Sequence, residues 1–131
     1  MKRRKILAAA AVGAAVAGWI LWGNSALMTS EYFVTSPRLP TGFEGFRIAQ
    51  VSDLHNTEFG EGNRNLLAAL EQAEPDIIVL TGDIIDARNT KPEISLAFAA
   101  EAMNIAPCYY ITGNHEARVD HLGFPEQLRS L

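Results

Sequence analysis

Three short polar clusters recur along this chain at almost constant spacing, each at the end of an apolar run. They are Ser52–His55, Thr81–Asp86 and Thr112–Glu116. Asp53 lies 30 positions before Asp83, which lies 31 positions before Asn114. One strand–helix–strand unit takes about 30 residues, and a right-handed parallel crossover returns the chain to the same end of the sheet. The spacing therefore predicts that the three clusters meet at one edge of a parallel sheet.

The apolar patterns predict an α/β fold with the element order βαβαβ. The expected strands are Phe46–Ser52, Ile77–Leu80 and Pro107–Thr112. The run Ile77–Leu80 is continuously apolar, which is typical of a central parallel strand covered on both faces. The segment Glu31–Thr35 favours an additional edge strand.

Helices are expected in both crossovers. Asn63 or Asn65 is expected to cap the first helix. Its inner face is predicted to be Leu66, Leu67, Leu70 and Ala73. The second helix is expected to run to about Asn104, with a capping box formed by Thr90 and Glu93.

The first 28 residues are interpreted as a membrane anchor or export signal. Residues 2–5 are all basic, and the run from Ile6 to Trp22 carries no charge. As a helix this run would span about 26 Å, at the short end for a bilayer crossing. The basic end predicts a cytoplasmic start and an extracytoplasmic domain. A cleaved signal, for which Arg3 and Arg4 resemble a twin-arginine leader, and a plain buried helix are the alternatives.

The remainder divides into a linker with the edge strand at residues 29–45 and a folded domain at residues 46–131, with a further helix from Pro125. All 15 acidic side chains lie here, whereas residues 2–5 hold four of the 11 basic ones. An acidic body argues against a general nucleic-acid binder. Cys108 is the only cysteine, so we expect a buried structural thiol and no intrachain disulfide.

The clusters contain the side chains of a divalent-metal site. Asp53 and His55 are two positions apart in an extended segment, so both can reach one ion. Asp83 follows a glycine in a tight turn, and its two oxygens can bridge two cations. Asn114 offers a neutral oxygen, and His115 beside it can act as an acid or a phosphate contact. Each cluster alone also has an ordinary explanation as strand-end polar residues, a turn or a helix cap; together they indicate a metal site.

In this order and at these intervals, Asp53-x-His55, Gly82-Asp83-x-x-Asp86 and Gly113-Asn114-His115-Glu116 resemble the calcineurin-like metallophosphoesterase family. The basic leader and the run Pro37–Pro40 are similar to its membrane-associated bacterial branch. The resemblance covers residues 31–131. It implies the N-terminal half of a fold in which two sheets pack between helices, preceded here by a transmembrane helix.

The resemblance also implies a ligand set for two divalent metal ions, which would be Mn, Fe or Zn. Asp53 and His55 would bind the first metal. Asp83 would bridge both metals, and Asn114 would bind the second.

The catalytic roles implied by the resemblance fall to two further side chains. His115 would stabilise the transition state or protonate the leaving oxygen, and Asp86 would orient the His115 ring. The implied reaction is hydrolysis of a phosphoester, such as a phosphodiester or pyrophosphate, by a metal-bound hydroxide.

Two departures from the family pattern limit what is expected. The family supplies further ligands from a later Gly-His-x-His stretch, whereas this chain has only His55, His115 and His121. His121 is interpreted as a surface loop residue, and the sequence is expected to be truncated inside the domain and inactive alone. Ala87 replaces the arginine of the phosphoprotein phosphatases and Arg88 comes one position late, which argues against a phosphoprotein substrate.

The sequence leaves substrate, metal identity, leader cleavage and oligomeric state open. An extracytoplasmic site suggests an envelope lipid or nucleotide conjugate as the phosphoester, with the membrane as a second partner. The rival hypothesis is a non-catalytic, membrane-tethered remnant or interaction module. A small redox domain is disfavoured, because the chain has no Cys-x-x-Cys pair and no glycine-rich dinucleotide loop.

Overall fold

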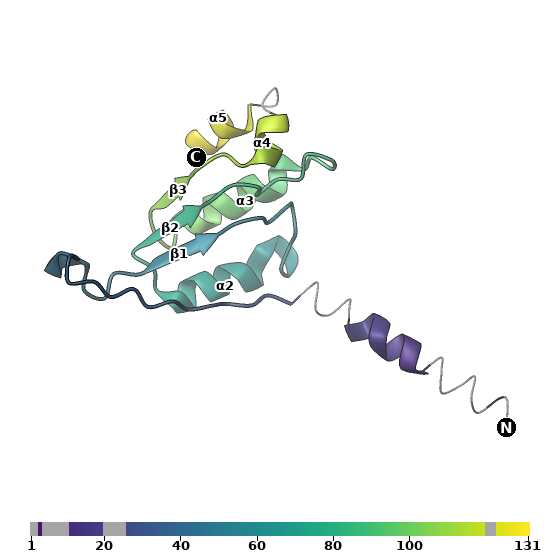
Figure 1. Ribbon diagram of the computed structural model, residues 1–131. Coiled ribbons are helices and arrows are strands. Elements are labelled where there is room, and N and C mark those ends of the chain that lie inside the picture. The colour runs from purple at the N-terminus through teal and green to yellow at the C-terminus, as the bar shows by residue number, and fades with distance from the viewer. Residues whose placement is uncertain (1–2, 4–10, 20–25, 120–122) are drawn as a thin grey trace.

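The computed structural model describes residues 3, 11–19, 26–119 and 123–131. Its elements are η1 (Thr41–Phe43), β1 (Ile48–Val51), η2 (Glu61–Asn63), α2 (Arg64–Ala73), β2 (Ile77–Leu80), α3 (Pro92–Met103), β3 (Cys108–Tyr110), α4 (Asn114–Arg118) and α5 (Phe124–Arg129). The predicted βαβαβ order is confirmed (Figure 1).

The three strands form one parallel sheet in the order β1-β2-β3. The register pairs Val51 with Leu80 and Leu80 with Tyr110. The outer strands are shorter than predicted, but the hydrogen bonding continues past their ends. The Thr81 N–H donates to the Val51 carbonyl at 2.9 Å, and the Ile111 N–H donates to the Leu80 carbonyl at 3.0 Å. The loops beyond the strands therefore start from a fixed register.

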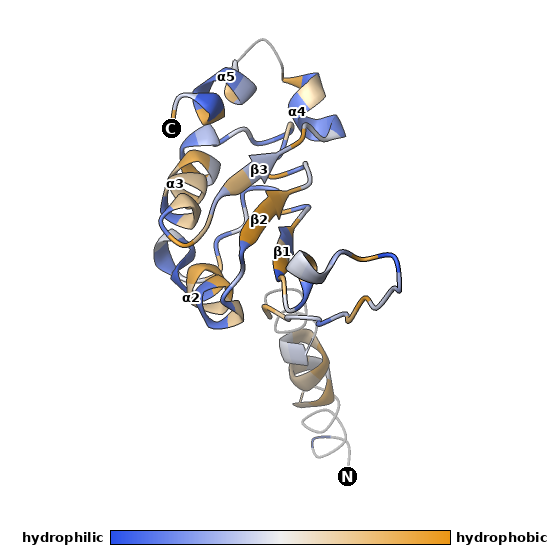
Figure 2. Cartoon of the chain, turned by 90° about the vertical axis from the view of Figure 1, so that its left-hand side faces the viewer, coloured by the Kyte–Doolittle hydropathy of each residue, from blue (hydrophilic) through white to orange (hydrophobic). Residues whose placement is uncertain are grey.

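Helices α2 and α3 cover one face of the sheet (Figures 1 and 2). The core between them contains Ile78 and Leu80 of β2 and Phe98 of α3, all buried. Leu66 and Leu70 carry the inner face of α2, as predicted, with Leu67 partly buried against the same cluster.

The other face of the sheet is open in the part of the chain that the structure describes. Ile48 and Tyr109 are each 60% exposed there. Strand β2 is central, as predicted, but it is not covered on both faces: Ile77 and Val79 are only partly buried, whereas Ile78 and Leu80 are buried. The apolar run thus identified the position of the strand in the sheet correctly and overstated its coverage.

The predicted position of the first helix cap is confirmed, but its side-chain capping bond is not, and the second predicted cap is wrong. Asn63 does precede α2, but it has a left-handed backbone (φ 61°) and its side chain makes no capping hydrogen bond. Its Oδ1 accepts the Phe59 N–H at 3.0 Å instead, so the side chain is used to close the preceding loop. Helix α3 starts at Pro92 after Lys91, without a side-chain cap. Proline suffices there because its fixed φ suits the first helical position and it has no N–H to satisfy.

The N-terminal part differs from two further expectations. The segment Glu31–Thr35 lies outside every described strand, and Tyr32 and Phe33 are almost fully exposed, so the predicted edge strand is wrong. The predicted membrane segment, residues 1–28, falls partly outside the described residues. Residues 11–19 are helical, and among the described residues no helix reaches the length and apolarity that a bilayer crossing needs.

The predicted burial of Cys108 is only partly met. Cys108 is only partly buried, and burial raises the pKa of its thiol. His121 lies outside the described residues.

Candidate metal centre

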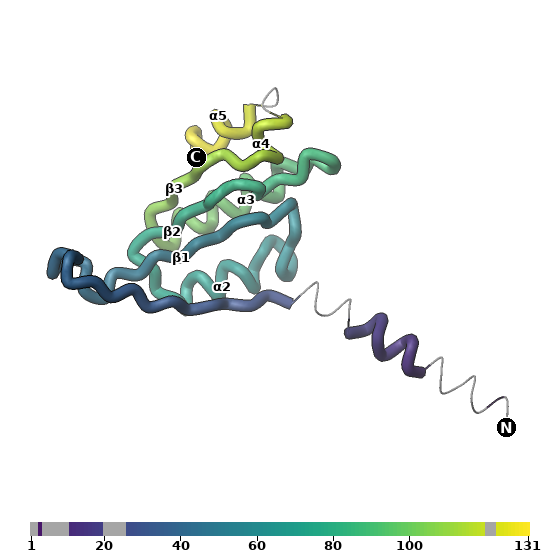
Figure 3. Tube along the Cα trace, viewed as in Figure 1, coloured from purple at the N-terminus to yellow at the C-terminus, as the bar shows by residue number. Residues whose placement is uncertain are grey.

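The three polar clusters converge as the spacing predicts. Each begins in the loop that leaves the carboxyl end of a strand, the third running on into the first turn of α4, and all three lie at the same edge of the sheet (Figure 3). Backbone hydrogen bonds hold the first loop to the second: Asp53 N–H donates to the Gly82 carbonyl at 3.1 Å, and His55 N–H donates to the Asp83 carbonyl at 3.0 Å. The ligand candidates are therefore carried by loops that are fixed to each other.

The backbone at this edge is unusual. Asp53, His55 and Asp83 have φ values of 55°, 49° and 52°, and Asn56 beside them has 58°. Non-glycine residues with positive φ are uncommon, and they cluster at functional sites where the surrounding structure holds them in place. Four such residues within two adjoining loops mark this edge as the site.

Two glycines let the second and third loops touch. A Cβ on Gly82 would lie 2.6 Å from the Gly113 backbone. A Cβ on Gly113 would collide with the backbone N and the carboxylate of Asp83. Only glycine, which has no Cβ, allows the two loops to approach this closely. This is why the Gly-Asp and Gly-Asn-His motifs each contain a glycine.

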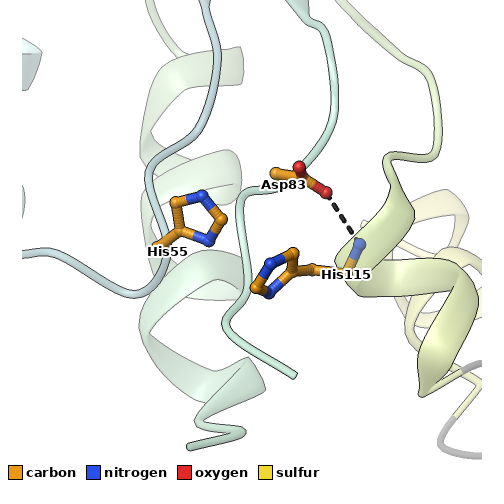
Figure 4. A group of neighbouring side chains, drawn as sticks. All are labelled: His55, Asp83 and His115. Carbon is orange, nitrogen blue, oxygen red and sulfur yellow. Dashed lines mark hydrogen bonds between the residues drawn. The ribbon is translucent and has the colours of Figure 1, made fainter. Parts of the chain in front are cut away.

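Three ligand side chains gather at the meeting point (Figure 4). One ligand atom from each of His55, Asp83 and His115 lies within 4.8 Å of the other two. The two imidazole rings are 4.4 Å apart between centroids, at an interplanar angle of 69°. The His115 side chain is only 12% exposed. Two imidazole nitrogens and a carboxylate oxygen are the donors that Zn, Mn and Fe accept in proteins.

His55 supplies an independent sign that these residues fit a cation. Its Nδ1 is buried and has no hydrogen-bond partner among the described residues. A buried polar atom without a partner is costly unless something binds it. A metal ion would satisfy such an atom.

Of the two remaining predicted ligands, Asp53 lies beside His55 but outside the group of three, and Asn114 lies next to His115 in the sequence. The Asp53 side chain is 67% exposed, and its Oδ1 lies 3.7 Å from His55 Nε2. Ser52 Oγ donates to the Asp53 Oδ2 at 2.6 Å. Asn114 is the first residue of α4 and is exposed. Asp53 thus lies on the His55 side of the group, and Asn114 follows Gly113 at the contact between the loops.

Asp86 lies next to the buried histidine. Its Oδ1 is 3.4 Å from His115 Nδ1, and the Ala87 N–H donates to the same nitrogen at 3.1 Å. The Ala87 contact assigns the proton of the neutral ring to Nε2. The Arg88 backbone N–H, which donates to Asp86 Oδ1 at 2.9 Å, lowers the pKa of the Asp86 carboxyl, so the carboxylate beside His115 is ionised at neutral pH.

Glu116 is the residue whose importance the sequence did not reveal. It is fully buried, and its carboxylate accepts four backbone N–H groups, from Asp83, Ile84, Ile85 and Gly113. The Gly113-x-x-Glu116 spacing, half of a capping box, was the available signal. That signal accounts for the Gly113 contact and says nothing of the other three.

A parallel α/β sheet with imidazole and carboxylate side chains converging at its carboxyl ends is the arrangement of an α/β protein with a candidate metal site outside the sheet. The family model described as "Calcineurin-like phosphoesterase" matches residues 46–130, and the chain belongs to that family. Its members are metal-dependent phosphoesterases, as the resemblance of the motifs implied.

One similar protein is the "Uncharacterized metallophosphoesterase YkuE" of Bacillus subtilis (strain 168), which is 34% identical over 102 residues. The match covers 73% of this chain and 34% of that protein, so the chain spans about a third of the length of the curated relative that it matches. No solved structure matches.

Proposed function

We propose that the protein acts as a phosphoester hydrolase with two divalent metal ions, Mn, Fe or Zn, at the carboxyl edge of the sheet. The observation that carries this proposal is the convergence of His55, Asp83 and His115 in a calcineurin-like phosphoesterase domain. The orphan Nδ1 of His55 supports it, because a cation would satisfy that atom.

The ligands divide between the two ions according to their loops. Asp53 and His55 would hold the first ion, because both side chains leave the loop after β1 and lie next to each other. Asp83 would be the carboxylate shared by both ions, a role supported by the hydrogen bonds of its loop to the His55 loop on one side and to α4 on the other. Asn114 contributes its amide oxygen to the second ion.

The chemistry requires little acid–base tuning from the protein. When bound, divalent metals supply an activated water and neutralise charge on the phosphoryl oxygens. His115 would donate a proton to the leaving oxygen; the Ala87 N–H, which donates to its Nδ1 at 3.1 Å, holds the ring, and the Asp86 carboxylate lies 3.4 Å from the same nitrogen. The alternative role for His115, as a third ligand, follows from its place in the group.

The substrate is an extracytoplasmic phosphodiester or pyrophosphate, such as an envelope lipid or nucleotide conjugate. This part of the proposal rests on the leader: the basic residues 2–5 and the uncharged run from Ile6 to Trp22 tether the domain to the membrane. The absence of arginine at position 87 supports a substrate other than a phosphoprotein.

The test uses the complete gene product, because residues 1–131 alone are expected to be inactive, with a Mn²⁺ titration and a generic phosphodiester, bis-p-nitrophenyl phosphate. We expect Mn²⁺ binding and Mn²⁺-dependent hydrolysis in the wild type, and loss of both in His55→Ala. Glu126→Gln, an exposed glutamate paired with Arg129 on α5, serves as the control and should match the wild type. A folded protein that binds Mn²⁺ but hydrolyses no phosphodiester or pyrophosphate would instead favour the tethered, non-catalytic module.

A further inference from the structure

We infer that Glu116 is a positioning residue: it fixes the separation between the Asp83 loop and the Asn114 turn, and thereby sets the affinity for divalent metal. This inference rests on the proposed metal-dependent function. It concerns a residue that binds neither metal nor substrate in that proposal.

A single oxygen of Glu116 joins the two motif loops. Oε2 accepts the Asp83 N–H at 2.8 Å and the Gly113 N–H at 3.0 Å. Because one atom accepts from both chains, their separation is fixed by two hydrogen bonds of ordinary length. Gly113 directly precedes Asn114, so the same oxygen sets the position of the two side chains assigned to the second ion.

The other oxygen shapes the loop after Asp83. Oε1 accepts the Ile84 N–H at 2.7 Å and the Ile85 N–H at 3.2 Å. Three consecutive N–H groups therefore point to one carboxylate, and this curls the backbone around it. The left-handed conformation of Asp83, with φ 52°, lies within this curl.

Asp83 is consequently held at both ends by the first turn of α4. Its backbone N–H donates to Glu116, and its carboxylate Oδ1 accepts the His115 N–H at 2.8 Å. The carboxylate that would bridge two cations has its direction set before any cation binds.

The burial of Glu116 shows that its role exceeds that of a helix cap. A fully buried carboxylate is costly unless charge-assisted hydrogen bonds compensate for lost water. A cap needs the Gly113 contact alone, whereas three of the four donors lie 31–33 positions away in the sequence. The Glu116 side chain is buried at the place where it can bond to the loop that carries Asp83.

The pattern of acceptors makes the usual conservative substitution disruptive. Each oxygen accepts two N–H groups, so the NH₂ of glutamine would face two donors in either orientation. Glu116→Gln therefore preserves the shape of the side chain and removes two of the four hydrogen bonds, while Glu116→Asp preserves the charge and shortens the reach.

The experiment compares full-length wild type, Glu116→Gln, Glu116→Asp and the control Glu126→Gln. Amide hydrogen exchange at Asp83, Ile84, Ile85 and Gly113 is measured without metal, and Mn²⁺ affinity is measured by calorimetry. In both Glu116 variants we expect faster exchange at these amides and a Mn²⁺ affinity roughly 10–100-fold weaker, as for other residues that orient metal ligands. The control should match the wild type in both measurements.

A folded Glu116 variant whose Mn²⁺ affinity stays within about twofold of wild type, well below the usual effect of such residues, would overturn the inference. Unchanged exchange at Asp83 and Gly113 would overturn it as well. If Glu116→Gln does not fold, Glu116→Asp decides by the same two measurements. Wild-type protein that binds Mn²⁺ without hydrolysing any phosphoester would overturn the proposed activity, and the exchange and affinity data would still decide the role of Glu116.

Discussion

The Asp83 carboxylate accepts a 2.8 Å hydrogen bond from the backbone N–H of His115. This bond links the second motif to the third across a gap of 32 positions. It makes the orientation of the Asp83 carboxylate depend on the start of α4. Substitutions in either loop should therefore change Mn²⁺ binding.

Gly113→Ala should damage the site directly. The added methyl group would collide with the Asp83 backbone and carboxylate, because it would occupy the contact between the two loops. We expect a loss of roughly 1–3 kcal/mol in the free energy of unfolding, as for other overpacked positions, together with weaker Mn²⁺ binding. Denaturant unfolding and calorimetry measure the two effects.

Gly42→Ala is the matched control, because a Cβ there meets nothing within 4 Å. Its unfolding free energy should stay within about 0.5 kcal/mol of wild type. Equal effects of the two substitutions would contradict the close approach of Gly113 to Asp83.

Asp83→Asn should separate metal binding from folding. Asparagine keeps an oxygen that can accept the His115 N–H, so the loop contact and the fold should survive, while the loss of negative charge should weaken Mn²⁺ binding by at least the 10–100-fold typical of supporting residues. Asp76→Asn should bind Mn²⁺ normally, since Asp76 contacts the Arg47 N–H and lies at the end of β2 opposite to the site. Normal Mn²⁺ affinity in Asp83→Asn would remove Asp83 from the ligand set.

Asp86 should stabilise the fold over a defined pH range. Its folded-state pKa is lowered from 3.8, chiefly by the Arg88 backbone N–H. Its contribution is therefore present above the unfolded pKa and lost as the pH falls through the lowered folded value. The difference in unfolding free energy between wild type and Asp86→Asn should be constant from neutral pH down to about 5 and shrink only below the unfolded carboxyl pKa. Unfolding curves at several pH values check this, and a difference already vanishing near neutrality would contradict it.

Tyr110 should limit stability in alkali. Burial, and next the negative charge of Glu116, raises the pKa of its phenol from 10.0 to about 12. The neutral phenol is favoured in the fold, so this contribution is complete below pH 10 and lost as the pH rises through the folded value. Tyr110→Phe should therefore lose less stability than wild type between these pH values. Denaturant unfolding with tyrosinate absorbance as a second probe measures it; identical alkaline losses in the two proteins would refute the assignment.

The meeting of Asp53, Asp83 and Asn114 at one edge followed from spacing alone, because right-handed crossovers in a parallel sheet leave few other arrangements. The central place of β2 followed from its apolar run. Both features depend on patterns that extend over many residues, so a departure at a single position does not change the prediction.

Features that depend on one side chain were not predictable in the same way. Asn63 has the sequence position of a cap, but its side-chain oxygen accepts the Phe59 N–H in the loop before α2. Glu116 has a cap's spacing but holds a loop more than 30 positions earlier. In each case the choice between local and distant partners is made by tertiary packing, which single-residue propensities do not contain.

The positive φ values at Asp53, His55 and Asp83 restrict which amino acids these positions can hold. Asp, Asn and His are the non-glycine residues that most readily adopt this backbone, and β-branched side chains are the least suited. The residue types that this backbone conformation favours are therefore also ones whose side chains bind metal ions through oxygen or nitrogen. Exchanging a carboxylate for the longer glutamate, or a histidine for a threonine, would alter the chain path as well as the donor atom. Attempts to change metal preference here are best directed at Asn114, which begins a helix with ordinary backbone angles.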